Sequence, residues 1–237
     1  MTVTREQLAV AVWRAAGSTP EGFREQLEGE WTTLALEAEN LVDLTVNFAA
    51  ADQGAYTRPL DADGLSANVD GFLMLGLERA HDLDDLPGRD DLYRLARRVD
   101  VWRVRSERPK AYERTWPDGT EAPGVKLVSF MRRAEGLNHE QFVRHWSEQH
   151  TPLALERHPG LWNYTQNYVR RAYTPGGRDV DGIAELHFAT RGDFDRRFFD
   201  SDEGRRVIME DVARFMGRPT LGSGLMTELP VKTGAAA

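Results

Sequence analysis

One histidine in this sequence differs from its counterpart in an earlier copy of the same segment. The stretch "WSEQHTPLALE" at residues 146–156 repeats "LEGEWTTLALE" at residues 27–37, and His150 stands where the earlier copy has Trp31. Imidazole is the side chain whose proton equilibrium lies nearest neutrality, and a general acid or base contributes roughly 10²- to 10⁴-fold in rate. His150 is therefore the first candidate for a catalytic acid or base. A purely structural role, in which it hydrogen-bonds a helix break before Pro152, is the alternative.

Two further ionisable side chains lie close together in the segment "DGIAELHFAT". Glu185 and His187 are two residues apart, so on a strand they share one face. They could orient His150 or share a proton with it, and a solvent-facing or inter-subunit pair is the simpler alternative. With His150 they would also form a two-histidine, one-carboxylate set of the kind that holds iron. The spacing matches no compact ligand motif, so we expect no metal.

The repeat extends far beyond this segment. Leu8–Phe23 aligns with Leu127–Phe142 at a constant shift of 119 residues, and Asp70–Arg79 aligns with Asp181–Thr190. A duplication of this length predicts two similar units. We expect a first unit with a degenerate site at residues 1–106, a linker at 107–123, a second unit with the working site at 124–232, and a flexible tail at 233–237.

Comparison of the copies separates positions that the fold needs from positions that can serve function. Leu73, Leu75 and Leu77 correspond to Ala184, Leu186 and Phe188, so these positions are apolar in both copies. We expect this face of the strand to lie under the helices. The positions that differ are Phe72, Met74, Gly76, Leu44, Val46 and Phe48, which become Ile183, Glu185, His187, Tyr164, Gln166 and Tyr168. We expect the differing set to face the space between the two units, where unpaired polar groups would cost about 1–3 kcal/mol each unless they have partners or a function.

These side chains complete the predicted site. Glu185, His187 and Tyr164 are expected to assist His150 in catalysis, and the substrate is expected to contact Gln166, Asn167, Tyr168 and Ile183. Asn167 corresponds to Asn47 in the first copy, so a structural role for it stays open. The remaining histidines, at positions 81, 139, 145 and 158, are expected on helix surfaces or turns.

Each unit is expected to contain a strand, a helix, two strands, a helix and a final strand. Asn138 and Ser201 can cap the two helices of the second unit, and Thr19 with Pro20 can start the first helix of the first unit. The second helix of the first unit is expected to carry Leu92, Leu95, Ala96 and Val99. A sheet with both helices on one face needs a cover for its other face. The predicted fold class is therefore α+β, with two tandem ferredoxin-like units whose sheets pair into an α+β barrel.

Residues 126–170 carry "EQF", "HW", a histidine before "PLA" and "YTQN", and "DGIAELHF" follows them. This pattern resembles the EthD family of dimeric α+β barrel proteins, directly in the second half and only through the repeat in the first. The resemblance implies cofactor-independent chemistry on hydrophobic, often phenolic or polyketide-like molecules. Decarboxylases, dehydratases, isomerases and accessory proteins of oxygenases are relatives of this kind.

Composition excludes several classes of function. The 237 residues have a formal net charge of −8 without a basic stripe, so nucleic acid is not an expected partner. The absence of cysteine excludes thiolate nucleophiles and disulfides. The sequence has no run of about 18 apolar residues, the length that would predict a membrane span, so we expect a cytoplasmic protein. A homodimer stays open, because the repeats could pair within one chain or between two.

The sequence thus predicts a cofactor-independent lyase or isomerase that acts on a hydrophobic oxygenated molecule, with His150 as general acid or base. The first alternative is a noncatalytic protein that binds a small molecule or assists an oxygenase. The second is a haem or non-haem iron oxidoreductase, in which a histidine holds the metal.

Overall fold

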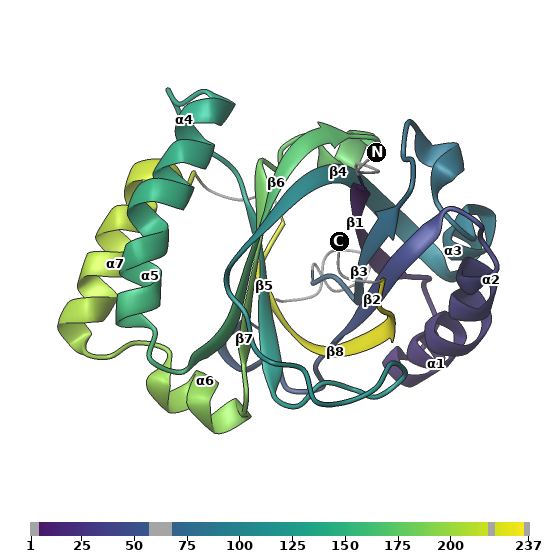
Figure 1. Ribbon diagram of the computed structural model, residues 1–237, viewed down its shortest axis with the longest axis horizontal. Helices are drawn as coiled ribbons and strands as arrows, with labels where there is room; N and C mark the ends of the chain where they lie inside the picture. The colour runs from purple at the N-terminus through teal and green to yellow at the C-terminus, as the bar shows by residue number, and fades with distance from the viewer. Residues whose placement is uncertain (1–4, 57–67, 218–220, 235–237) are drawn as a thin grey trace.

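The computed structural model describes residues 5–56, 68–217 and 221–234, and it has an α+β fold. Its described strands are β1 (Glu6–Arg14), β2 (Leu41–Ala49), β3 (Gly71–Leu77), β4 (Ala96–Lys110), β5 (Val125–Met131), β6 (Leu161–Ala172), β7 (Gly182–Phe188) and β8 (Gly224–Lys232). All adjacent strands are antiparallel, and they close a barrel in the order β1-β3-β2-β8-β5-β7-β6-β4 (Figure 1). The α+β barrel expected from the sequence is confirmed.

The two halves of the chain contribute strands in the same order. Each half has its fourth strand beside its first, then its third and its second, as β4-β1-β3-β2 and β8-β5-β7-β6. The halves join where β2 pairs with β8 and where β4 pairs with β6. The repeats therefore pair within one chain, and neither half closes the barrel by itself.

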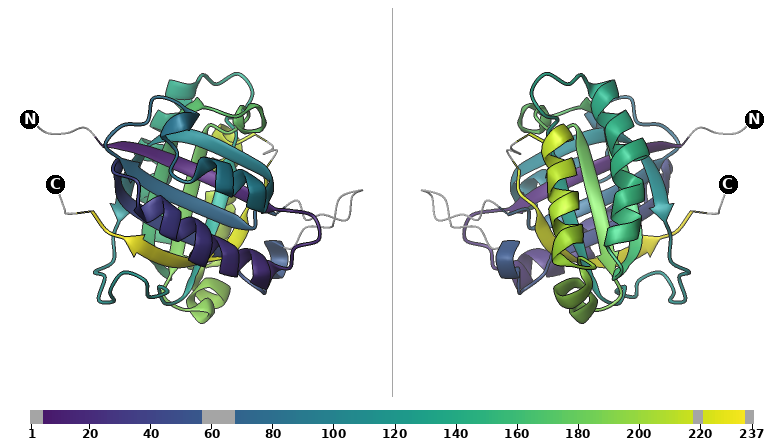
Figure 2. Two further views of the ribbon diagram at one scale, coloured as in Figure 1. Left: turned by 90° about the vertical axis from the view of Figure 1, so that its right-hand side faces the viewer. Right: turned by 90° about the vertical axis from the view of Figure 1, so that its left-hand side faces the viewer.

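The helices pack on the outside of the barrel, one group over each half (Figure 2). The first half carries α1 (Pro20–Gln26), a π-helical turn η1 (Leu27–Trp31), α2 (Thr32–Leu36) and α3 (Arg89–Leu95). The second half carries α4 (His139–Arg144), the π-helical turn η4 (His145–His150), α5 (Thr151–Arg157), α6 (Arg191–Arg197) and α7 (Asp202–Phe215). No described helix is long and apolar enough to cross a membrane.

The helix starts follow the sequence signals. Asn138 and Gln141 form a reciprocal capping box at α4, because the side chain of each accepts a hydrogen bond from the backbone N–H of the other. Ser201 caps α7, and Thr19 caps α1 with Pro20 in its first turn. All three predicted caps are confirmed.

The helix break expected before Pro152 is wrong. α4, η4 and α5 follow one another without interruption, and η4 widens the helix by one π-helical turn. Thr151 Oγ1 donates to the carbonyl of Trp146 at 2.8 Å within this turn. The first half has the same wide turn and the same contact, from Thr32 Oγ1 to the carbonyl of Leu27 at 2.7 Å, without a proline. The turn is thus a property of the repeated unit that Pro152 fits, not a distortion that Pro152 causes.

Two boundaries also differ from expectation. Ala96 and Val99 lie in β4 and not on the second helix of the first half, because α3 ends at Leu95. β4 continues to Lys110, into the segment expected as a linker. Of the expected tail, residues 235–237 lie outside the described part of the chain.

Three apolar clusters fill the molecule. One lies between sheet and helices in the first half and a second lies between sheet and helices in the other half. The third, which contains Trp13, Phe72, Trp102 and Phe130, lies inside the barrel. Because side chains alternate along a strand, successive residues of each strand point into the barrel and toward the helices in turn.

Candidate active site

The predicted site residues divide between the two faces of the second half's sheet. On β7 the alternation expected from the sequence is correct, since Ala184, Leu186 and Phe188 pack under the helices and Ile183 packs inside the barrel. On β6 the assignment is wrong. Tyr164 and Tyr168 pack under the helices, because β6 and β7 pair with Tyr164 opposite Leu186 and Gln166 opposite Ala184. Directly paired residues of neighbouring strands share a face, so these side chains point away from the barrel interior.

His150 is buried at the end of the π-helical turn, 8% exposed. Its Nδ1 lies 3.0 Å from Oδ2 of Asp211 on α7. Burial lowers the pKa of His150, against the opposing effect of the Asp211 carboxylate. The imidazole is therefore neutral near pH 7, with Nδ1–H donating to Asp211 and the Nε2 lone pair without a hydrogen-bond partner among the described residues.

Asp211 is the functional candidate that sequence reasoning missed. It is 3% exposed and also lies 2.9 Å from Nε2 of His145, so one carboxylate holds two imidazoles. His145 is not the surface residue expected, since it is partly buried and its ring stacks on Phe215. The signal was available, because Asp211 lies three residues after Ile208 on the buried face of the second helix, where a carboxylate needs a partner.

Tyr164 is the centre of a buried hydrogen-bond network on the same side of the sheet. Its hydroxyl accepts from Nε1 of Trp146 at 2.7 Å and from Nε2 of Gln166 at 3.1 Å. Gln166 in turn donates to Thr151 and accepts from the hydroxyl of Tyr168, both at 2.8 Å. Burial raises the pKa of Tyr164 to about 12, so it stays protonated at neutral pH.

A cavity of about 600 Å³, here named the helix-side cavity, brings His150 and Tyr164 together between the sheet and the helices of the second half. Its walls are mostly apolar and aromatic, and they include Trp146, Phe194, Phe198, Phe215, Leu186 and Met131. His158 also lines it, although the sequence placed this residue in a turn. His158 is 2% exposed, its Nδ1 contacts the carbonyl of Phe198, and burial lowers its pKa.

Glu185 and Asn167 lie on the opposite face of the sheet, in a second cavity inside one end of the barrel. Glu185 binds the ammonium group of Lys126 at 2.6 Å and accepts from Nδ2 of Asn167 at 2.8 Å. Lys126 also forms an ion pair with Glu228. Burial would raise the pKa of Glu228, but Lys126 reverses this and lowers it to about 2.

His187 lies on the same face of β7 as Glu185, beside Lys126 and Glu228, and its ring centroid is 5.7 Å from that of Tyr112. Its Nε2 lies 2.9 Å from the carbonyl of Pro123, and burial lowers its pKa. Glu185 and His187 share one face of β7, as expected, but their convergence with His150 on one enclosed space is wrong, because the sheet separates His150 from both of them. For the same reason the two-histidine, one-carboxylate metal set is not assembled. Within residues 5–56, 68–217 and 221–234 no group of three or more histidines, aspartates and glutamates could hold a metal ion.

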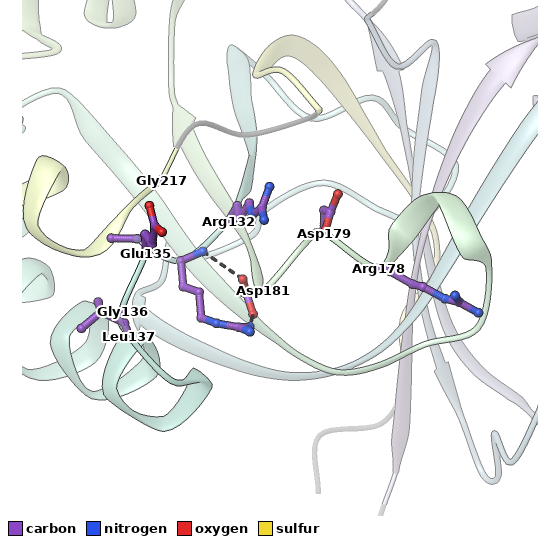
Figure 3. A pocket seen from close by; sticks show the side chains of 10 residues that line it. Arg132, Glu135, Gly136, Leu137, Arg178, Asp179, Asp181 and Gly217 are labelled. Carbon is purple, nitrogen blue, oxygen red and sulfur yellow. Dashed lines mark hydrogen bonds and ion pairs between the residues drawn. The ribbon is translucent and has the colours of Figure 1, made fainter.

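A third hollow, on the surface near the start of α4, is part of the repeated fold (Figure 3). In it the backbone N–H of Arg133 donates to Asp181 at 2.9 Å, and the guanidinium of Arg133 pairs with the same carboxylate. The first half repeats this contact, from the N–H of Arg14 to Asp70 at 3.0 Å. The pair fixes the end of the first strand of each unit, so we assign this hollow no catalytic part.

Part of the second half matches a family model. Residues 134–219 fit the family model described as EthD domain, and this range contains His150, Tyr164 and Asp211. Residues 134–219 of this chain are thus similar to the EthD domain. The model does not extend over the first half, in which Trp31 fills the place of His150 and donates to the carbonyl of Gly88 at 3.1 Å. The matched range thus lies within the half that has the helix-side cavity.

Solved structures share the fold of the EthD domain together with the first half. An anthrone oxidase-like protein has a TM-score of 0.60 at 13% identity, over 100% of this chain and 99% of its own. A putative monooxygenase from Fusobacterium nucleatum has a TM-score of 0.52 at 9% identity, over 98% and 96%. A putative chlorite dismutase has a TM-score of 0.51 at 11% identity, over 97% and 96%. At these identities the similarity shows the fold alone. No curated protein matches the sequence.

Proposed function

We propose that the protein removes a proton from a hydrophobic, oxygenated small molecule bound in the helix-side cavity, with His150 as the general base. The observation that supports this is the neutral imidazole of His150, whose Nδ1 contacts Asp211 and which lines an apolar cavity of about 600 Å³. A buried imidazole held by a carboxylate is oriented for proton transfer, because the carboxylate selects the tautomer and stabilises the imidazolium that forms.

The chemistry follows from the groups around the cavity. Nε2 of His150 takes a proton from an acidic C–H or O–H of the substrate, and the substrate keeps the electron pair as an enolate or phenolate. Tyr164, protonated because burial raises its pKa to about 12, can turn its hydroxyl toward the developing oxyanion. The imidazolium then returns its proton to another atom in an isomerisation, or to the departing hydroxyl, which leaves as water, in a dehydration. In a decarboxylation the first proton comes from an O–H, and the imidazolium returns it to the carbon from which CO₂ departs. Lyase or isomerase chemistry is thus the proposed reaction class.

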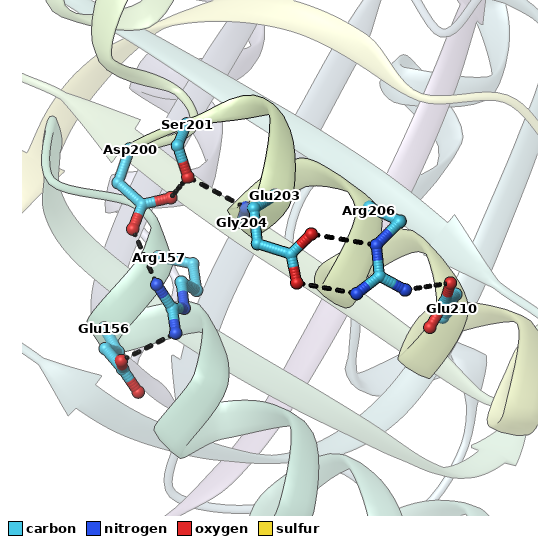
Figure 4. Close-up of polar contacts among 8 residues, drawn as sticks. All are labelled: Glu156, Arg157, Asp200, Ser201, Glu203, Gly204, Arg206 and Glu210. Atoms are coloured by element: carbon cyan, nitrogen blue, oxygen red, sulfur yellow. Dashed lines mark hydrogen bonds and ion pairs between the residues drawn. The ribbon is translucent and has the colours of Figure 1, made fainter.

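The substrate class follows from the walls. Phe194, Phe198 and Phe215 offer aromatic contacts, and Arg205 lies at the cavity margin without an ion pair to any described residue. The next residue on α7 is different, because Arg206 binds Glu203 at 2.6 Å and Glu210 at 2.5 Å (Figure 4). We propose an aromatic or polyketide-like molecule whose acidic group pairs with Arg205. Arg205→Gln should raise the dissociation constant of a carboxylated ligand about two- to fivefold, as expected for an exposed ion pair, and Arg206→Gln should not.

Proton abstraction can be tested without knowing the product. Anthrone and hydroxylated aryl ketones, with and without a carboxylate, would be incubated with the protein in deuterium oxide, and NMR would measure deuterium incorporation at the acidic carbon. The wild type should accelerate exchange and His150→Gln should lose at least about 100-fold of that acceleration. His139→Gln is the matched control, because His139 contacts Asp181 outside the cavity. Ligand binding without exchange in the wild type would favour the noncatalytic alternative.

One observation favours a second candidate function, an oxidoreductase with bound haem. A metal-bound histidine usually donates its other N–H to a carboxylate, a backbone carbonyl or water, and His150 has a carboxylate partner in Asp211. His150 would hold the haem iron, and haem would supply electron-transfer or dioxygen chemistry. Protein produced with added haem would then show a Soret band that His150→Gln changes. A haem-free sample that catalyses exchange would exclude a need for the group.

A further inference from the structure

The two ends of the barrel interior differ in polarity. One end is filled by apolar side chains, including Trp13, Phe72, Trp102 and Phe130. The other end encloses a cavity of about 440 Å³, here named the barrel-end cavity, to which all eight described strands contribute side chains. Because the sheet separates it from the helix-side cavity, it is a distinct compartment that the proposed chemistry does not use.

The lining of the barrel-end cavity is rich in cations. Its ionisable side chains, excluding tyrosine, are Arg5, Arg108, Arg114, Lys126 and Lys232 on the positive side and Asp43, Glu185 and Glu228 on the negative side. The lining therefore carries an excess of positive charge, although the whole chain has a formal charge of −8. Such a concentration of cations within low-dielectric walls attracts anions.

Each side-chain oxygen of the two glutamates in the cavity already has a partner. Glu185 accepts from Asn167 with one oxygen and from Lys126 with the other. Glu228 accepts from the hydroxyl of Tyr112 at 2.8 Å and pairs with Lys126 through its other oxygen. The one ammonium group of Lys126 thus pairs with both carboxylates, so this buried cluster keeps one net negative charge, and among the described residues no group of three or more His, Asp and Glu side chains could hold a metal ion.

Several other polar side chains of the lining, among them Asn163, Thr165 and Arg108, have no side-chain hydrogen-bond partner among the described residues. Asn163 is 5% exposed, and its Oδ1 is buried without a donor. Thr165, two residues along β6, is 7% exposed and shares the cavity-facing side of that strand. Arg108 on β4 is exposed and lines the same cavity; it makes no ion pair to the described chain, although the Asp43 carboxylate of the same lining lies within its electrostatic reach. A buried amide without a partner costs about 1–3 kcal/mol, which a bound ligand would recover.

We propose that the barrel-end cavity binds a compact hydroxylated oxyanion, a phosphate or a hydroxycarboxylate. Its negative oxygens accept hydrogen bonds from Arg108 and Thr165, and its hydroxyl donates to Oδ1 of Asn163. An apolar molecule would leave these groups unpaired, and a cation would meet the excess positive charge. The site thus differs in ligand chemistry from the helix-side cavity.

Isothermal titration calorimetry of the full chain tests this at constant ionic strength, set with sodium chloride. Inorganic phosphate and citrate are the two probes, and they distinguish a phosphate from a hydroxycarboxylate. At least one should bind with a stoichiometry of one and a dissociation constant below about 1 mM. Arg108→Gln and Thr165→Val should each weaken binding, the first by about tenfold or more.

The matched control is Arg105→Gln on the same strand. Arg105 pairs with Glu107 and lies over the ring of Tyr168 at 4.8 Å, outside the barrel interior, so its loss should change affinity less than about twofold. Absence of saturable binding of either probe up to about 10 mM overturns the proposal. Equal weakening by Arg105→Gln and Arg108→Gln also overturns it, because that result indicates nonspecific attraction to surface charge.

Discussion

Replacing Asp211 with asparagine tests the reasoning about the candidate active site most directly. The carboxylate accepts a hydrogen bond from Nδ1 of His150 and another from Nε2 of His145. Asparagine keeps the shape but has one acceptor oxygen and one donor NH₂ group. One imidazole must therefore lose its partner or change its tautomer, and neither imidazole faces a negative charge any longer.

The magnitude follows from these two contacts. A hydrogen bond to a charged group contributes about 1.5–3 kcal/mol, and Asp211→Asn removes the charge from both contacts and the acceptor from one. The free energy of unfolding should fall by about 1.5–3 kcal/mol, and the rate of proton abstraction by about 10- to 150-fold. His150→Gln should abolish the catalysed exchange in either background, so the two substitutions should not be additive.

The assay combines denaturant unfolding with NMR of the imidazole nitrogens. The pKa of His150 is already lowered by burial, and the Asp211 carboxylate opposes that shift. In Asp211→Asn the pKa of His150 should therefore fall further, and the acid limb of the exchange rate should move to lower pH while the plateau drops. An unchanged or higher pKa of His150, or an unchanged plateau, would refute the role given to Asp211.

Two other predictions concern stability. Burial lowers the pKa of His150, His158 and His187. Below about pH 6.5 the unfolded chain therefore binds more protons than the folded chain. The free energy of unfolding should decrease as pH falls through this range, by up to about 1.4 kcal/mol per pH unit for each histidine. Urea unfolding at pH 7.5, 6.5 and 5.5 measures this, and a flat profile would contradict it. Lys126→Met leaves two buried carboxylates without their cation and should cost about 3–5 kcal/mol at pH 7, with part of the loss recovered at lower pH as a carboxylate gains a proton. A loss below about 1 kcal/mol in the same titration would count against the buried ion pairs.

The barrel could be predicted from the sequence because the features that indicate it occur along the whole chain. The repeat, the alternation in strands and the caps at Thr19, Asn138 and Ser201 depend only on local spacing. On β7 the comparison with the first copy also assigned the faces correctly, since the apolar positions Leu186 and Phe188 pack under the helices.

The site was harder to predict because alternation says which residues share a face but not which face it is. On β6 the polar replacements at Tyr164, Gln166 and Tyr168 suggested a space between the units, whereas their polar atoms are satisfied by Trp146 and Thr151 under the helices. Only the strand register, which places Tyr164 opposite Leu186, resolves this. Likewise the contact between His150 and Asp211 joins residues 61 positions apart, and no spacing rule predicts it.

The pairing of β2 with β8 and of β4 with β6 has a consequence for how this protein holds its shape. A barrel assembled from two separate copies comes apart on dilution and obliges both copies to have the same sequence. Here one covalent chain supplies both partners, so closure is independent of concentration and the partners are free to diverge. The first half, in which Trp31 is buried, can then diverge independently of the half that carries the proposed site around His150.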